Sequence, residues 1–214
     1  MGRLPPQPPA SLDQGRRPSW SPRPLPEASK LNGVVTVDVV RHYCIVTEWP
    51  FPDSGGVPSP QIVAAWAQLG LLPTEKVPLW AAHWLVAGYD GEHLVSLAGL
   101  HGDDPHDVHD ALPDALLDCG VAIPNSDVAA ASLSFTHLAR MHVDGLAAAK
   151  WVGQKVEEVL IRSGYARDVI DLPLGRLYDI ADEWGAGWGR TDQELAAIVR
   201  EACEEQLRNG SVAT

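Results

Sequence analysis

Residues 79–117 read LWAAHWLVAGYDGEHLVSLAGLHGDDPHDVHDALPDALL, and this stretch decides the fold. It divides into three helix-sized pieces. Apolar and aromatic residues recur at helical spacing in the first piece, which ends at Gly88. Asp90 has a side chain that can cap the second piece. Asp104 can cap the third, where Pro105 takes the first helical position. The stretch therefore predicts three short helices in succession.

The third piece has the clearest pattern. Its apolar residues fall at i, i+3, i+4, i+7 and i+8, which is one face of a helix: Val108, Ala111, Leu112, Ala115 and Leu116. Pro113 interrupts this face, because proline removes a backbone donor and clashes with the preceding turn. We expect a helix that is kinked or split at Pro113.

The second and third pieces together resemble a helix-turn-helix. Ala98, Gly102 and Val108 fall near the positions of the small residue, the turn glycine and the buried aliphatic residue of that motif. The resemblance is confined to these two pieces and implies a DNA-binding regulator. The segment that corresponds to the recognition helix has no Arg or Lys and carries Asp104, Asp107 and Asp110. Affinity for duplex DNA depends on neutralising phosphates, so our interpretation is a helix-turn-helix shape without DNA binding.

Capping residues and apolar stripes mark five further helices. Their expected starts are Ser59–Pro60, Asn125 or Ser126, Asp144, Asp171–Pro173 and Thr191, and their expected ends are Gly70, Met141, Gly164, Trp184 and Arg208. Thr74 can cap the first helix of the central stretch. Thr191 and Glu194 form a T-x-x-E capping box, in which each residue satisfies a free N–H of the other. The pattern predicts a mainly α fold, an irregular multi-helix bundle of about eight helices.

The chain is expected to divide into four parts. Residues 1–32 are rich in Pro and Arg and cannot bury enough apolar surface to offset the entropy of ordering, which predicts a disordered extension. That extension is either inert, a proline-rich ligand or a basic tether. Residues 33–58 have strand composition followed by a Pro/Gly linker, so at most one or two short strands are expected. Residues 59–208 form the helical domain, and residues 209–214 a frayed tail.

Charge and cysteine content narrow the functional classes. A net charge of −12 argues against binding to nucleic acid or an anionic membrane and favours a partner with a basic or amphipathic surface. The three cysteines are far apart and show no metal-ligand spacing, which is typical of free thiols in a reducing compartment. No apolar run reaches transmembrane length. We expect a cytoplasmic protein, and the excess of arginine over lysine with many prolines favours a bacterial source.

The strongest concentration of metal-ligand types is the segment His101–Asp110. His106, His109 and Asp110 lie three and four residues apart, so they share one surface of a helix, and His101 precedes them. Imidazole and carboxylate groups are the usual ligands of zinc and iron. The spacing matches no specific metal signature, and an acidic first turn is also what the helix dipole favours. No cofactor-binding motif is present, and we expect no cofactor.

Tryptophan usage points to binding. Eight tryptophans against two phenylalanines is unusual, and Trp is enriched at interaction hot spots. Trp184 and Trp188 flank a glycine-rich break, where a loop can present at least one of them to a partner. The first hypothesis is a non-enzymatic interaction module of adaptor or neutralising type. The alternatives are a metal-binding protein or metal-dependent enzyme that uses the His101–Asp110 cluster, and a helix-turn-helix-like regulator.

Overall fold

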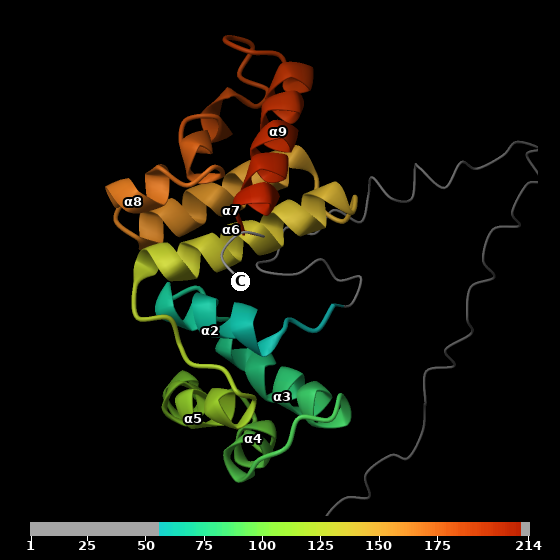
Figure 1. Ribbon diagram of the computed structural model, residues 1–214, viewed down its shortest axis with the longest axis vertical. Helices are drawn as coiled ribbons and strands as arrows, with labels where there is room; N and C mark the ends of the chain where they lie inside the picture. The colour runs from blue at the N-terminus through green and yellow to red at the C-terminus, as the bar shows by residue number, and fades with distance from the viewer. Residues whose placement is uncertain (1–55, 211–214) are drawn as a thin grey trace, which may run out of the picture. The chain divides into compact units, whose positions relative to one another are not determined.

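The computed structural model describes residues 56–210, and this part of the chain is mainly helical with no strand (Figure 1). The mainly α prediction is confirmed. The expectations for residues 1–55 and 211–214 lie outside the described residues. No helix between residues 56 and 210 is long and apolar enough to cross a membrane. The elements are α2 (Pro60–Gln68), η1 (Thr74–Lys76), α3 (Val77–Val86), α4 (Glu92–Ala98), α5 (Pro105–Asp118), α6 (Asp127–Val143), α7 (Ala149–Arg162), α8 (Arg167–Ile170), η2 (Gly175–Leu177), η3 (Ala181–Glu183) and α9 (Asp192–Gly210).

The helices pack around two apolar cores that share α2. One core joins α2 to α3, α4 and α5, and its largest fully buried side chain is Trp66. The other joins the opposite side of α2 to α6, α7, α8 and α9, where Ala65 and Leu69 contribute from α2. Figure 1 shows α2 between α3 and α6. The buried apolar residues of α2 therefore lie on two faces of the helix, one in each core, and α2 connects the two cores.

The start of α4 corrects a prediction. Asp90 was expected to cap this helix, but the N-cap position is Gly91 and no side chain near it in sequence provides a cap. The N–H of Leu94 instead donates to Oδ2 of Asp118, at the end of α5, over 2.9 Å. A Cβ on Gly91 would lie 2.2 Å from the Asp118 carboxyl carbon. The capping carboxylate comes from a different helix because Gly91 lets that helix approach closely.

The α5 helix begins as predicted and continues through its proline. The side chain of Asp104 accepts a hydrogen bond of 2.9 Å from the N–H of His106. Pro113 lies inside one helix that runs from Pro105 to Asp118, so the expected split does not occur. Burial of the apolar face offsets the missing hydrogen bond, since Val108, Leu112, Ala115 and Leu116 are all inside the core.

The turn between α4 and α5 requires a glycine. Gly102 has a φ of +74°, and a Cβ there would lie 2.9 Å from the carbonyl oxygen of Glu75. Any side chain would therefore strain the backbone and collide with η1. Ala98, on α4, is half-buried and Val108, on α5, is fully buried. The three positions that carry the helix-turn-helix resemblance thus have packing roles in the core around α3, α4 and α5.

One of two predicted caps around α6 and α7 is confirmed. Ser126 caps α6, since its Oγ accepts from the N–H of Ala129 over 3.4 Å. Asp144 was expected to start α7, which is wrong: its N–H still donates to the carbonyl of Arg140 over 2.9 Å, so it ends α6. Gly145, with a φ of +74°, then turns the chain. The α7 helix begins later, at Ala149.

The helix predicted from Asp171 to Trp184 does not form. The chain instead makes the short helix α8 before Asp171 and two separate 3-10 turns after it, η2 and η3. The reason is a close backbone approach: a Cβ on Gly175 would lie only 2.0 Å from the carbonyl oxygen of Val169. Leu174, Leu177 and Ile180 are buried nevertheless. Consecutive tight turns therefore bury apolar side chains of this segment without a continuous helix.

Candidate functional site

The predicted metal ligands lie on the surface around the start of α5. His106 Nε2 is 3.7 Å from Asp110 Oδ2, and both side chains are exposed. His101 lines an open pocket of about 320 Å³ together with Asp103, Asp104 and Asp107. His109 is exposed on the same helix. Among residues 56–210, no group of three or more His, Cys, Asp or Glu side chains is arranged to hold a metal ion. The structure brings together only the pair His106 and Asp110, and the metal hypothesis stays a prediction.

The two predicted interaction residues have different environments. Trp184 is half-buried and packs against the core around α6, α7 and α9. Its Nε1 lies 3.7 Å from the position that a Cβ on Gly153 of α7 would take. Trp188 is 64% exposed. The glycine-rich break therefore uses one tryptophan as an anchor and presents the other to solvent.

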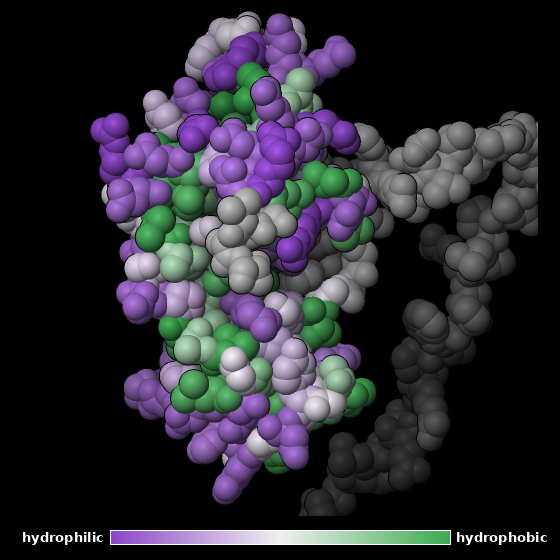
Figure 2. Space-filling view, viewed as in Figure 1, coloured by the Kyte–Doolittle hydropathy of each residue, from purple (hydrophilic) through white to green (hydrophobic). Residues whose placement is uncertain are grey.

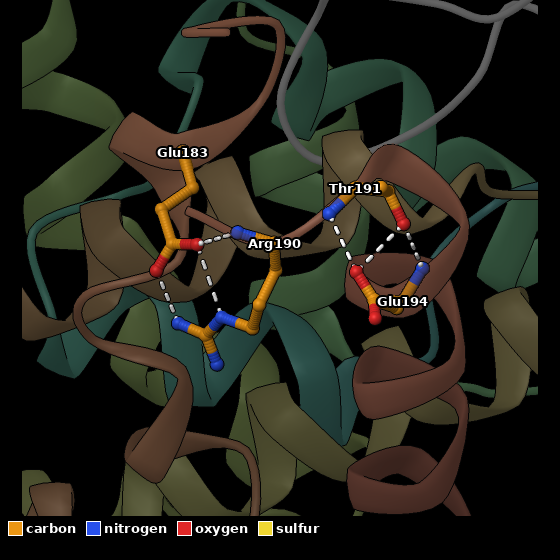
Figure 3. A network of polar contacts seen from close by, with 4 residues as sticks. All are labelled: Glu183, Arg190, Thr191 and Glu194. Carbon is orange, nitrogen blue, oxygen red and sulfur yellow. Dashed lines mark hydrogen bonds and ion pairs between the residues drawn. The ribbon is translucent and has the colours of Figure 1, made fainter. Parts of the chain in front are cut away.

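A bidentate ion pair closes the loop that carries Trp188 (Figure 3). The backbone N–H and the Nε of Arg190 each donate to Oε2 of Glu183 over 3.0 Å. The Nη2 of Arg190 donates to Oε1 of the same carboxylate. These hydrogen bonds lower the pKa of Glu183 to about 2 and raise the pKa of Arg190. Glu183 and Arg190 thus form a clamp across the ends of residues 183–190.

Glycines allow the clamped loop to turn so tightly. Gly185, Gly187 and Gly189 all have φ between +72° and +78°, a region that other residues enter only with strain. A Cβ on Gly189 would lie 2.7 Å from Oε2 of Glu183, whereas a Cβ on Gly187 would meet nothing within 4 Å. The backbone fits around the carboxylate on one side of Trp188 and leaves open space on the other.

The C-terminal end of the loop is fixed to α9. The N–H and Oγ1 of Thr191 each donate to Oε2 of Glu194 over 2.8 Å, and the N–H of Glu194 donates to Oγ1 of Thr191 over 3.3 Å (Figure 3). The capping box predicted from the sequence is confirmed. Gly185 N–H also donates to Oδ1 of Asp192 over 3.3 Å. The loop is therefore held by side chains at both ends.

Acidic residues flank the loop in the sequence. Residues 179–194 hold five carboxylates and one arginine, which gives a net charge of −4. Four of these carboxylates are exposed: Asp179, Asp182, Asp192 and Glu194. The fifth, Glu183, is neutralised by Arg190. Figure 2 shows that the visible face of α9, which follows the loop, is predominantly hydrophilic. Trp188 is therefore an exposed aromatic side chain in an acidic segment of the chain.

The sequence analysis did not predict the ion pair between Glu183 and Arg190, although the sequence contains a pattern that favours it. Glu183 and Arg190 are opposite charges at the two ends of a segment with three glycines, WGAGWG. Oppositely charged residues on either side of a short glycine-rich segment can reach each other when the chain turns back on itself. No local pattern predicts the capping role of Asp118, because Leu94, whose N–H donates to its carboxylate, lies 24 residues earlier in the chain.

Comparison with known proteins gives no match: no family model, no curated protein and no solved structure is significantly similar to this chain. The function is therefore argued from the Trp188 loop itself.

Proposed function

We propose that this protein is a non-enzymatic interaction module, of adaptor or neutralising type, that binds a partner protein with a basic surface through the loop Glu183–Arg190. The observation that carries the proposal is Trp188, which is 64% exposed in a loop clamped by an ion pair. An exposed Trp in a flexible loop has no fixed orientation. Here the clamp, the capping box and the half-buried Trp184 fix the backbone on both sides.

The energetics favour a contact at this position. An aromatic side chain of this size buries on the order of 200 Å² when fully covered. Covering the exposed part of Trp188 would stabilise a complex by about 3 kcal/mol. A loop that is already ordered loses little conformational entropy on binding, so more of this free energy contributes to affinity. Tryptophans in such positions are among the residues most enriched at hot spots.

The charge distribution supports a basic partner. The loop region has a net charge of −4 and the whole chain −12. Negative surfaces speed the association of positively charged proteins and repel nucleic acid and anionic lipid. Burying Trp188 against a basic surface satisfies both features of the site, the apolar ring and the carboxylates around it.

Co-purification with matched variants tests the proposal. The full chain, tagged and expressed at its native level in its own cells, is isolated gently as wild type, Trp188→Ala and Val86→Ala. Val86 is 88% exposed on α3 and provides the control for loss of an exposed apolar side chain. We expect a stoichiometric protein partner with wild type and Val86→Ala, and its loss with Trp188→Ala. A partner retained by Trp188→Ala, or no partner with wild type, would overturn the proposal.

A further inference from the structure

We propose that the Trp188 loop binds an arginine side chain in an exposed segment of the partner, with the guanidinium stacked on the indole ring of Trp188 and paired with the carboxylates around the loop. This inference rests on the proposed function and specifies the chemistry of the contact.

The indole ring of Trp188 is open to a ligand. Within residues 56–210 it takes part in none of the ring or cation contacts, which involve Trp66, Trp80, His137, Trp151 and Lys155. The adjacent Gly187 leaves open space, since a Cβ there would meet nothing within 4 Å. A cation placed over the face of a tryptophan is attracted by the ring quadrupole, and Trp provides the strongest such interaction among the aromatic residues.

The loop does not supply that cation itself. Arg190 is the only basic residue between 179 and 194, and its guanidinium and backbone N–H are bound to Glu183. Asp179 and Glu194 act on the same guanidinium, because both raise the pKa of Arg190. The negative charge also extends toward Tyr165, which follows α7: the hydrogen bond to Glu157 is the main cause that raises the pKa of Tyr165, and the charge of Asp182 adds to it. Residues 179–194 therefore hold four exposed carboxylates besides Glu183 and no second basic residue.

Arginine fits this arrangement better than lysine. Its guanidinium is planar, stacks flat on an aromatic ring and still presents N–H donors at its edge to carboxylates. A lysine ammonium is compact and more strongly hydrated, so it loses more on leaving water to lie against the ring. The site combines a ring and carboxylates, and arginine is the side chain that uses both at once.

Three synthetic peptides test the inference. They share one sequence with three cationic positions, filled by arginine, by lysine, or by citrulline, which has the shape of arginine without its charge. Each is titrated calorimetrically into the full chain at physiological salt, as wild type, Trp188→Ala and Val86→Ala. We expect the arginine peptide to bind about tenfold more tightly than the citrulline peptide, and measurably more tightly than the lysine peptide. Trp188→Ala lowers its affinity about tenfold and Val86→Ala leaves it unchanged.

Two results overturn the inference. Equal binding of the arginine and citrulline peptides excludes charge recognition, and an arginine affinity that Trp188→Ala does not change excludes the ring. The co-purification separates this failure from failure of the proposed function. If no arginine peptide binds but a protein partner still depends on Trp188, the arginine inference is wrong and the interaction role stands. If neither peptide binding nor co-purification of a partner depends on Trp188, the arginine inference and the proposed function are both wrong.

Discussion

Glu183 and Arg190 decide whether Trp188 has a fixed position, and acid provides a test of their ion pair. Arg190 lowers the pKa of Glu183 to about 2 from an ordinary value of 4.5. Because the folded-state pKa is the lower one, the stabilisation is fully present above pH 4.5 and is lost as the pH falls toward 2. We expect Glu183→Gln to lower the denaturation midpoint at pH 7 and to match wild type near pH 2.

The Glu183→Gln experiment needs a control in which another exposed carboxylate is replaced by an amide. Asp114→Asn, at an exposed position on α5 that makes no ion pair within the described residues, serves as the control. A Glu183→Gln variant whose midpoint differs from wild type equally at pH 7 and pH 2 would show that the ion pair does not stabilise the loop.

Gly189 provides a second test at the scale of single residues. Both Gly187 and Gly189 have positive φ, so alanine at either position costs about 1 kcal/mol of backbone strain. Only at Gly189 would the new Cβ also displace the Glu183 carboxylate, from 2.7 Å. We expect Gly189→Ala to be the more destabilising of the two and to increase quenching of tryptophan fluorescence by acrylamide. Equal stabilities for the two variants would contradict the close fit around Glu183.

Among the elements, α4 depends on a carboxylate from another helix. The pKa of Asp118 is lowered, first by the hydrogen bond from the Leu94 N–H and then through His93, whose Nδ1 lies 3.4 Å from Oδ1 of Asp118. We expect Asp118→Ala to fray the start of α4 and to speed amide hydrogen exchange at His93 and Leu94. Asp114→Ala, on the same helix, is the control. Unchanged exchange at His93 and Leu94 would show that α4 needs no cap from α5.

The sequence predicts those elements whose signals are local. Thr191 with Glu194, Ser126 and Asp104 each cap a helix within three residues of themselves. The first and the last are the predicted caps, and Ser126 is one of the two candidates predicted for α6. Asp90 and Asp144 have side chains that can cap a helix, but neither caps the helix that follows it. The segment after Asp171 has helical spacing, yet Gly175 turns it back against α8. A distant residue, Asp118, decided only the first of these errors, whereas tight local turns at Gly145 and Gly175 decided the other two.

For the molecule as a whole, the fold class could be predicted because apolar periodicity covers nearly every segment between residues 59 and 208. The contribution of α2 to two cores could not be predicted, because the spacing of its apolar residues indicates a single buried face. The same limit applies to the site. Composition singled out Trp184 and Trp188 together, but only tertiary packing against Gly153 shows that one is an anchor and the other is exposed.

Acid sensitivity of the whole domain is expected from His137. This residue of α6 lies against Trp66 of α2, with ring centroids 6.0 Å apart, and burial followed by the charge of Arg140 lowers its pKa from 6.5 to about 4. Between those values the unfolded chain takes up a proton that the folded chain does not. Stability is therefore full above pH 6.5 and falls by roughly 3 kcal/mol as the pH drops to 4.

Urea unfolding at intervals from pH 7 to pH 4 measures this loss, with His137→Gln as the comparison. The variant has no titrating group at position 137, so we expect a flatter dependence of its unfolding free energy on pH. Curves for wild type and variant that run parallel over the whole range would show that His137 does not sense acid.

The most direct test of the central claim is site-specific photo-crosslinking in the cells that make the protein. A benzophenone amino acid replaces Ala186, an exposed residue of the same loop that leaves Trp188 in place, in one full-length variant and the exposed Val86 in the other. If the Trp188 loop is the interaction site, irradiation yields a discrete covalent adduct with one protein from position 186 and none from position 86. No adduct at position 186, or the same adducts from both positions, would contradict the claim.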